Sequence, residues 1–517
     1  MLQIYDTTLR DGAQSVGVNF SLEDKLLIVK KLDELGVDYI EGGWPHASNI
    51  KEVEFFKRVK NFDTNAKIAA FGCTKKPNSK IEEDQFINNL IDAQTKVVTI
   101  FGKSWDLHVD AVLRTTLENN LIMIKESVEY LKSAGKEVIF DAEHFFDGYK
   151  ANKDYTLQTI LAAQSAGADM IVFCDTNGGC LPEEIEKIIQ EVKEKLQIPF
   201  GVHCHNDSGL AVANSLKAIH NGAVQIQGTI NGYGERCGNV DLCTLIPNLK
   251  LKMGIDVATD EQLSKLKSIS NLVSSLANKR PFEHYPYVGE YAFTHKGGMH
   301  IDAVLKNKKT FEHIEPELVG NSTDWLVSEQ AGKGIILAKL KELGFSFEKG
   351  SPEIENILSA VKEKEALGFT YEAAPASFKL LVLKILNKFS EPFAIDHYEI
   401  ITKKLSDNET ESIAKVCLRV GENVECSKAI GRGPINALDL ALRQVLSKFY
   451  PEVDKIELVD YKVCVLSSTD GTAANVRVLI QFADQEERWG TVDVADNIIE
   501  ASWQALLEGF YYKLVKI

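Results

Sequence analysis

The sequence lacks the features of membrane, secreted and nucleic-acid-binding proteins. No apolar run reaches the roughly 20 residues that a membrane-spanning helix requires. The N-terminal segment, residues 1–6, opens directly into a strand-like pattern without the basic and apolar regions of a signal peptide. Acidic residues outnumber basic ones, 74 to 58, and the net charge of -16 disfavours nucleic acid or an anionic membrane as a partner.

Cysteine is also sparse. The nine cysteines are scattered and form no Cys-x-x-Cys pair. This pattern predicts reduced thiols in a cytoplasmic protein and no disulfide framework. We therefore expect any metal site to use His, Asp and Asn side chains in preference to thiolates.

The first half of the chain alternates short apolar runs with amphipathic helical patterns. This alternation predicts a parallel sheet, and eight such units over about 250 residues are what a (β/α)8 TIM barrel requires. The alternative is a doubly wound open sheet, but the Rossmann glycine fingerprint is missing after the first run. The eight runs are Leu2–Tyr5, Val37–Ile40, Lys67–Phe71, Val97–Phe101, Val138–Phe140, Met170–Phe173, Phe200–Val202 and Val224–Ile230.

Polar residues stand just after these predicted strands. In a barrel all such positions converge on the carboxyl-end face, where active sites of this fold lie. His203 and His205 are spaced i, i+2, so both imidazoles point to the same side of their strand and can hold a divalent metal. Taken alone, they could also be two polar residues at a strand terminus. The set comprises Arg10, Asp11, Glu41, Glu143, His144, Asp175, Thr176, His203, His205, Asn231 and Asn239.

The rest of the chain changes character twice. We predict a catalytic barrel over residues 1–255, helical linker subdomains over 256–390 and a separate domain over 391–517. In the last segment the apolar period becomes two, and a β-β-β-α pattern repeats, which indicates an internally duplicated domain. In the linker, Gly297 and Gly298 lie between His295 and His300. This segment suggests either a close backbone approach to a ligand or a turn between helices.

Three motifs together resemble those of the 2-isopropylmalate, homocitrate and citramalate synthase family. They are Asp6-Thr-Thr-Leu-Arg-Asp-Gly12, His203-Cys-His-Asn-Asp207 and Gly234-Glu-Arg-Cys-Gly-Asn239. The resemblance extends along nearly the whole chain, and the order and spacing of the motifs are highly specific. The wording of residues 40–45, Ile-Glu-Gly-Gly-Trp-Pro, looks most like the citramalate synthase branch.

The resemblance implies a Claisen-type condensation of acetyl-CoA, as cosubstrate, with a 2-oxo acid, followed by thioester hydrolysis. It implies metal ligands at Asp11, His203, His205 and Asn239, a mixed nitrogen and oxygen set that suits Mg²⁺, Mn²⁺ or Zn²⁺. Such an ion would polarise the keto group of the 2-oxo acid. For Asp11 and Asn239 the alternative is an ordinary turn role.

The resemblance also assigns roles around the metal. Arg10 would stabilise the developing alkoxide, unless it only forms an ion pair with Glu41 or Glu143. Thr176 would bind the substrate carboxylate, unless it only caps the next helix. His300 and Asp302 would supply the base that removes the acetyl proton, with Glu143 as a second candidate for base or substrate binding. Ala303 departs from the family pattern, in which Gly is common, and leaves the local backbone open.

The substrates implied by the citramalate branch are pyruvate and acetyl-CoA, in isoleucine biosynthesis. The alternatives are a 2-isopropylmalate synthase acting on 2-oxoisovalerate, a homocitrate-type enzyme with an extra cationic group in its pocket, a related lyase, and a non-catalytic amino-acid sensor. One methylene discriminates weakly between 2-oxo acids. The resemblance further implies a homodimer and an amino-acid effector, isoleucine before leucine, at the C-terminal domain, with no nucleic-acid or membrane partner.

Overall fold

The computed structural model describes residues 2–46, 48–325, 332–348, 350–406, 409–466 and 474–515. Its contacts divide the chain into two compact units. The first comprises Met1–Phe293 and Ile314–Thr323, and the second Thr294–His313 and Asp324–Ile517. The first long segment ends at Phe293, and the predicted boundaries at residues 255 and 390 stay predictions. None of the helices in the described ranges is long and apolar enough to cross a membrane.

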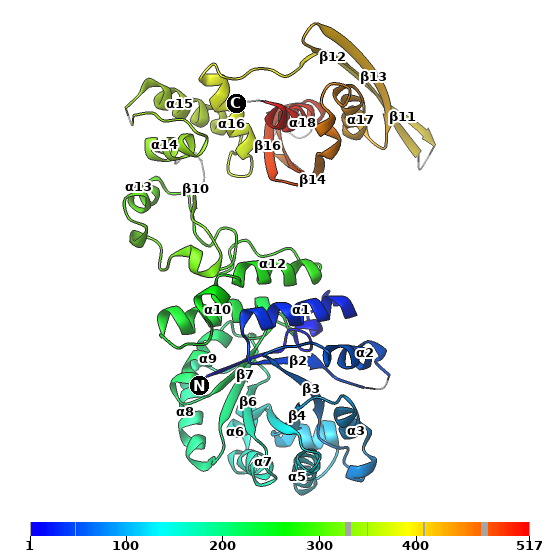
Figure 1. Ribbon diagram of the computed structural model, residues 1–517, viewed down its shortest axis with the longest axis vertical. Coiled ribbons are helices and arrows are strands. Elements are labelled where there is room, and N and C mark those ends of the chain that lie inside the picture. The colour runs from blue at the N-terminus through cyan, green and yellow to red at the C-terminus, as the bar shows by residue number, and fades with distance from the viewer. Residues whose placement is uncertain are drawn as a thin grey trace. The chain divides into compact units, whose positions relative to one another are not determined.

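The first unit is a closed barrel of eight parallel strands, as predicted (Figure 1). The strand order follows the chain, and β1 closes the barrel by pairing with β8, where Gln3 lies opposite Gln225. An open doubly wound sheet is therefore excluded. The strands are β1 Gln3–Asp6, β2 Tyr39–Gly43, β3 Lys67–Cys73, β4 Val97–Lys103, β5 Glu137–Glu143, β6 Met170–Asp175, β7 Phe200–Cys204 and β8 Gln225–Gly228.

The helices of this unit begin and end where local chemistry favours it. Ser21 forms a capping box with Asp24 at the start of α1, and Gly36 ends that helix in the left-handed conformation at φ 87°. Pro182 opens α8. The helices are α1 Leu22–Leu35, α2 Ile50–Val59, α3 Gln85–Asp92, α4 Asp106–His108, α5 Leu117–Ser133, α6 Phe145–Ala151, α7 Lys153–Ser165, α8 Pro182–Val192, α9 Ala211–His220, α10 Leu242–Pro247, α11 Asp260–Leu263 and α12 Leu266–Leu276.

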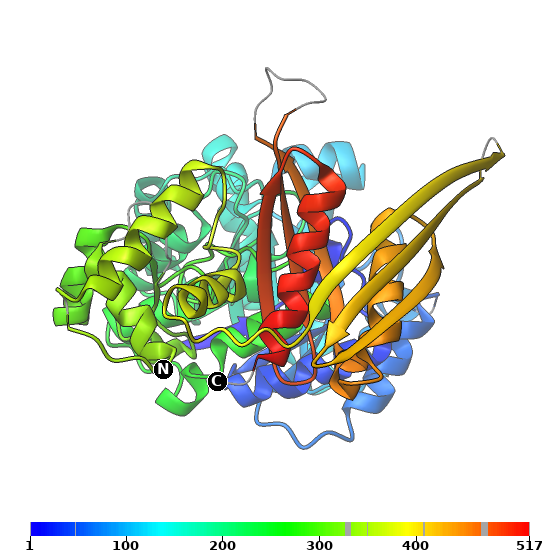
Figure 2. The same ribbon diagram turned by 90° about the horizontal axis from the view of Figure 1, so that it is seen from above.

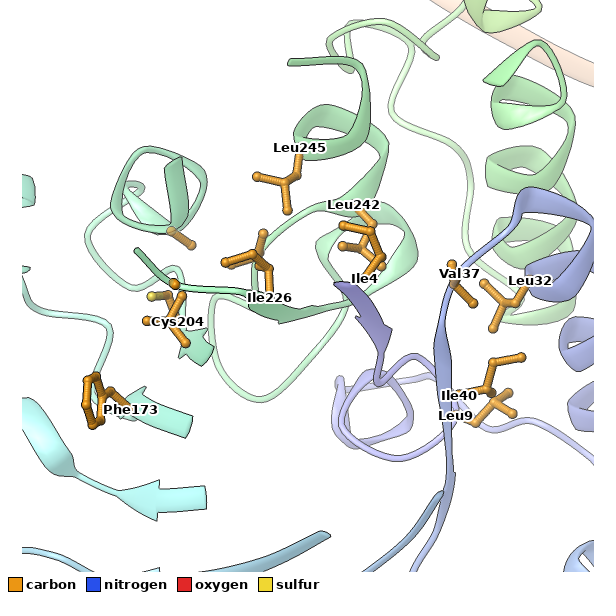
Figure 3. Packing of buried hydrophobic residues seen from close by; sticks show 14 of the residues in the cluster. Ile4, Leu9, Leu32, Val37, Ile40, Phe173, Cys204, Ile226, Leu242 and Leu245 are labelled. Carbon is orange, nitrogen blue, oxygen red and sulfur yellow. The ribbon is translucent and has the colours of Figure 1, made fainter. Parts of the chain in front are cut away.

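The core of the first unit has two layers. One large cluster of buried side chains lies between the strands and the surrounding helices, and Figure 3 shows part of it, from Ile4 and Ile226 to Leu32 and Leu245. A smaller cluster, which includes Tyr5 and Met170, fills the barrel interior. The interior is thus packed, and the polar strand ends remain available at the carboxyl-end face.

The second unit begins with helices, as predicted for the linker, and one short parallel strand pair. Ile301 of α13 belongs to a buried cluster that contains residues of α14–α16 and also Val492 of the C-terminal domain. The segment around His300 therefore shares a core with that domain. The elements are β9 Thr294–His295, α13 Gly298–Lys306, β10 Asp324–Trp325, α14 Lys333–Glu342, α15 Pro352–Ala366 and α16 Pro375–Ile385.

The C-terminal part contains the predicted duplication. Two antiparallel three-stranded sheets, β11-β12-β13 and β14-β15-β16, are each followed by one helix (Figure 2). The helix α17 packs on β12 and β13, and α18 packs on β15 and β16. The elements are β11 Ala394–Ser406, β12 Glu409–Val420, β13 Asn423–Gly431, α17 Pro434–Leu446, β14 Glu457–Val465, β15 Val476–Ala483, β16 Arg488–Ala495 and α18 Ile498–Leu514.

One expectation about cysteine is corrected here. Cys417 and Cys426 form a disulfide between β12 and β13, whereas the scattered cysteines predicted reduced thiols throughout. The two residues are register partners in the antiparallel pair, with their Cα atoms 4.1 Å apart, so the hairpin itself brings the sulfur atoms together. This pairing could not be predicted from the sequence because it depends on strand register.

Candidate active site

Three potential metal ligands gather at the carboxyl end of the barrel. His203 lies on β7 and His205 directly after it, and both side chains point the same way, as strand alternation predicts. Asp11 lies in the turn after β1. The Asp11 Oδ2 atom is 3.3 Å from His203 Nε2 and 4.0 Å from His205 Nε2. All three residues are buried, and among the described residues they form a group able to hold a metal ion.

Asn239, the fourth predicted ligand, reaches the same point. It pairs with His205 in an isolated antiparallel bridge, and its amide nitrogen is 3.5 Å from His203 Nε2. Asp11 Oδ1, His205 Nδ1 and Asn239 Oδ1 are buried and have no hydrogen-bond partner within the described ranges. Leaving such groups unsatisfied is costly, and their donor chemistry fits a divalent cation. The residues present therefore fit the implied metal.

The electrostatics of the cluster agree with this fit. Burial works to raise the pKa of the Asp11 carboxyl, but Arg10 and the two histidines outweigh it and hold that pKa well below its usual range. Burial, together with the neighbouring His203, lowers the pKa of His205 to about 3. Asp11 is thus a carboxylate and His205 a neutral imidazole, which are the forms that bind metals.

Arg10 is held on two sides. Its Nε donates to Glu41 Oε1 at 2.5 Å, and its Nη1 donates to Asp11 Oδ2 at 3.1 Å. The guanidinium also lies over the ring of Phe71, with Cζ 3.8 Å from the ring centroid. The predicted ion pair with Glu41 is therefore present. It orients Arg10 beside the metal ligands and does not exclude a substrate role for the remaining N–H groups.

The other barrel candidates, Glu143 and Thr176, lie on neighbouring strand ends. Glu143 ends β5 and forms an ion pair with Lys103, which ends β4. Thr176 follows β6, and its Oγ1 accepts a hydrogen bond of 2.8 Å from the backbone N–H of His144. The N-cap of α8 is Leu181, so the alternative in which Thr176 caps that helix is wrong.

The two residues predicted to supply the catalytic base lie in the second unit. His300 and Asp302 are the third and fifth residues of α13, so their spacing of two directs them to different sides of the helix. The ring of His300 stacks on Phe311 at a centroid distance of 4.0 Å, and Asp302 pairs with Lys306. Gly297 caps α13 and Gly298 begins it, so this segment joins the short strand β9 to a helix and is not the turn between two helices of the alternative interpretation.

Comparison with known proteins identifies the family to which this chain belongs. The HMGL-like family model matches residues 1–273. The chain belongs to the HMGL-like family. Two further models match the second half: the homocitrate synthase post-HMGL domain-like model over residues 287–367 and the LeuA allosteric (dimerisation) domain over residues 372–514.

Full-length relatives sharpen the family assignment. This HMGL-like chain is 52% identical to an (R)-citramalate synthase of Aquifex aeolicus, over 99% of this chain and 98% of that protein. It is 50% identical to an (R)-citramalate synthase of Geobacter sulfurreducens, over 100% and 98% of the two chains. A 2-isopropylmalate synthase of Methanocaldococcus jannaschii is 33% identical, over 99% and 95%. The predicted membership in this synthase family is confirmed.

An aromatic wall adjoins the metal cluster of this HMGL-like chain, and the sequence alone did not reveal it. Trp44 directly follows β2, and Phe71 and Phe101 lie two residues before the ends of β3 and β4. The rings of Phe71 and Phe101 stack with centroids 5.5 Å apart. Trp44 meets both rings edge-on. In the sequence these are apolar residues near the ends of three strands, a pattern that also fits ordinary core residues. Only the closed barrel shows that they lie beside the predicted metal ligands.

Three polar residues were also missed. Lys103 ends β4 and pairs with Glu143, while Asp141 and Gln227 lie within the barrel below His203. Gln227 sits in the alternation Gln225-Ile226-Gln227, and both glutamines are fully buried. Two amide side chains spaced two residues apart in an apolar strand could have indicated a polar network inside the barrel, because buried polar groups require hydrogen-bond partners.

Proposed function

We propose that this protein is an (R)-citramalate synthase, which condenses acetyl-CoA with pyruvate and hydrolyses the thioester to release CoA. The observation that carries the proposal is 43–52% identity to five curated (R)-citramalate synthases over 99–100% of this chain. The buried Asp, His, His cluster at the carboxyl end of the barrel supports it. A product of this kind serves isoleucine biosynthesis, in a cytoplasmic setting.

The barrel residues bind and orient the 2-oxo acid in this proposal. Asp11, His203, His205 and Asn239 would hold a divalent metal, and when bound it would supply Lewis-acid polarisation of the keto group. Arg10, fixed by Glu41, directs its free N–H groups at the oxygen on which charge develops. The Thr176 hydroxyl accepts from the His144 N–H, and its own proton is therefore free to bind the substrate carboxylate.

Proton removal from the acetyl group is assigned to His300 with Asp302 in support, and Glu143 is the second candidate for the base or for orienting the substrate. A methyl group beside a thioester is a weak carbon acid, so its base must be positioned and shielded from water. The resulting carbanion attacks the keto carbon of pyruvate. Glu143, paired with Lys103, lies at the same face as Thr176 and contacts the substrate from the β5 side.

The aromatic wall favours pyruvate over larger or charged 2-oxo acids. Trp44, Phe71 and Phe101 present apolar ring surface close to Arg10, which suits a methyl group. A homocitrate-type enzyme would need a free cation for its second carboxylate. The cation near Phe101 is Lys103, and Glu143 neutralises it.

The test is release of CoA from acetyl-CoA with pyruvate, 2-oxobutyrate, 2-oxoisovalerate and 2-oxoglutarate in parallel, with divalent metal supplied. We expect the highest kcat/KM with pyruvate and (R)-citramalate as the product in chiral chromatography. A preference for 2-oxoisovalerate would move the protein to the 2-isopropylmalate synthases while keeping the metal site. Inactivity with all four acids would favour the sensor hypothesis.

The C-terminal domain is assigned to feedback and self-association. The LeuA allosteric (dimerisation) domain model over residues 372–514 supports an amino-acid effector and a homodimer. The end product of the proposed pathway, isoleucine, is the effector we expect. Inhibition by isoleucine that is non-competitive with pyruvate would support this role, and equal inhibition by leucine and isoleucine would count against it.

A further inference from the structure

Gln227 lies directly beside a metal ligand inside the barrel. Its strand β8 pairs with β7 so that Gln227 is the register partner of His203. Gln225 and Gln227 alternate with Ile226 and therefore share the interior face of β8. Both glutamine side chains are fully buried, so each needs hydrogen-bond partners within the barrel.

The partners of Gln227 fix which way its amide points. Its Nε2 donates to Asp141 Oδ1 at 3.0 Å, and its Oε1 faces His203 Nδ1 at 2.9 Å. Burial raises the pKa of Asp141 to about 7, and in its ionised form the carboxylate accepts and cannot donate, so ionised Asp141 selects the NH₂ end of the amide. The carbonyl end is left for His203, and it too can only accept. His203 Nδ1 must therefore carry a proton.

In the neutral ring, the form that binds a metal, this tautomer leaves the lone pair of His203 on Nε2. That atom is 3.3 Å from Asp11 Oδ2 and 3.4 Å from His205 Nε2, at the centre of the ligand cluster. His205 is different, because its Nδ1 has no hydrogen-bond partner in the described part of the chain. One histidine of the pair is thus locked from behind, and the other is positioned by its backbone bridge to Asn239.

We propose that Asp141 and Gln227 are positioning residues that hold His203 in its metal-binding tautomer and orientation. Asp141 orients the Gln227 amide, the amide carbonyl accepts a hydrogen bond from the Nδ1–H of His203, and Nε2 is left to bind the metal. A hydrogen-bonded partner behind a ligating histidine typically contributes about 10- to 100-fold to metal affinity. The inference rests on the metal site of the proposed function and is independent of which 2-oxo acid the enzyme prefers.

The test compares two glutamines of the same strand. In the full-length protein, Gln227→Leu removes the acceptor behind His203, whereas Gln225→Leu removes an equally buried amide whose Nε2 instead donates to Gln3 Oε1. Binding of Mn²⁺ and Zn²⁺ is measured by chelator competition without substrates. We expect Gln227→Leu to bind about 10- to 100-fold more weakly than the native chain, and Gln225→Leu within about threefold of it. Equal affinities for the two variants would overturn the proposal.

A conservative variant and the native chain provide further readings. Asp141→Asn keeps a carbonyl that accepts from Gln227, so we expect it to bind metal more tightly than Asp141→Leu. In native protein labelled with ¹⁵N-histidine, with His203→Gln identifying the signal, metal-free His203 should carry its proton on Nδ1. A bare Nδ1 would overturn the proposal even if the Gln227→Leu chain failed to fold. Absence of metal binding by the native chain would instead remove the metal site, and with it the proposed mechanism.

Discussion

At the scale of single residues, the predicted metal ligands at the carboxyl end of the barrel are buried from water. Asp11, His203 and His205 bring three electron-pair donors within 4.8 Å of one another in buried positions. Arg10 supports the group from one side through Asp11 and is itself anchored by Glu41. Substitution of any of these residues is expected to lower metal affinity or stability strongly, because it leaves a buried polar partner without a hydrogen bond or ion pair.

Removal of one histidine should abolish metal binding and activity together. We expect His205→Ala to lose at least about 100-fold in metal affinity, since a buried three- or four-ligand site loses both a donor and its geometry. Metal content and CoA release are measured on the same preparation after chelation and metal addition. His220→Ala, at the exposed end of α9, serves as the matched control. Normal activity of His205→Ala would refute the ligand assignment.

Truncation of the aromatic wall should relax the choice of 2-oxo acid. Phe101→Ala removes a ring that stacks on Phe71, and the space gained admits one or two additional methylenes. We expect the ratio of kcat/KM for 2-oxobutyrate over pyruvate to rise by about tenfold, the scale on which one methylene discriminates. The ratio is determined by CoA release with both acids. An unchanged ratio would show that Phe101 does not face the substrate side chain.

At the scale of elements, the helix α16 contacts a strand and a helix of the C-terminal domain through buried polar groups. The strand β16 and the helix α18 bring Asp493 and Glu508 together inside the C-terminal domain. Glu508 accepts a hydrogen bond from Ser377 of α16, which also receives the backbone N–H of Val492 at 2.9 Å. The linker helix α16 is thus bonded to both elements of the second βββα half, and a change in charge there affects their packing.

The acid on β16 should make the C-terminal domain lose stability as pH rises. Burial, reinforced by Glu508, raises the pKa of Asp493 to about 7. Between the pKa of an unfolded Asp, about 4, and this value, the unfolded chain releases the proton and the folded chain keeps it, so stability falls with rising pH. Asp493→Asn lacks this loss. We expect it to be more stable than the native chain at about pH 7.5 and to differ little at about pH 4.5.

Hydrogen exchange of peptides from β16 and α18 measures this difference locally. Asp496→Asn, an exposed acid in the turn after β16, is the control and should give the same difference from native at both pH values. If protection in Asp493→Asn relative to native did not increase between the two pH values, the raised pKa of Asp493 would be excluded.

At the scale of the whole molecule, the segment that carries the proposed base shares a buried core with the C-terminal domain. The segment carrying His300 belongs to the second unit, and Ile301 packs in one cluster with Val492 of the C-terminal domain. Ending the chain at residue 390 would remove Val492 and Leu479 from that cluster. Such a truncation is expected to disturb the proposed base as well as the proposed effector site, so point substitutions separate the two proposed roles better than deletion.

Self-association should depend on the exposed face of the first C-terminal sheet. Ile401, Ile413 and Ile430 are register partners across β11, β12 and β13, on the face opposite to Ala414 and Ala429, which are buried with α17 in one core cluster. Ile430 is 62% exposed. Apolar rows of this kind mark interfaces, and a two-fold interface would bring the substituted residue of each copy into the same contact.

We expect Ile430→Glu to weaken dimerisation by about 10-fold or more, as the loss of a central apolar contact does. Sedimentation velocity over a range of concentrations measures the dissociation constant. Leu367→Glu introduces the same charge at another exposed apolar site, 63% exposed, and should leave assembly unchanged. Native-like assembly of Ile430→Glu would place the interface elsewhere.

The sequence determined the local order of this protein. Alternating apolar runs and caps such as Ser21 and Gly36 specified the strands, the helices and the closed barrel, because such patterns depend on neighbours along the chain. The resemblance of three sequence motifs implied Asp11, His203, His205 and Asn239 as ligands, and strand polarity explains why these residues lie at one face of the barrel. The change of the apolar period to two near residue 391 predicted the duplicated domain.

Only the tertiary structure decided which distant groups meet. The disulfide of Cys417 and Cys426, the pairing of Lys103 with Glu143 and the contact of Gln227 with Asp141 all depend on strand register. A shift of register by one residue would reverse which face each side chain occupies, and no local pattern encodes that choice for polar residues. The placement of α13 in the core of the second unit likewise follows from packing, which the spacing of His300 and Asp302 along the chain does not reveal.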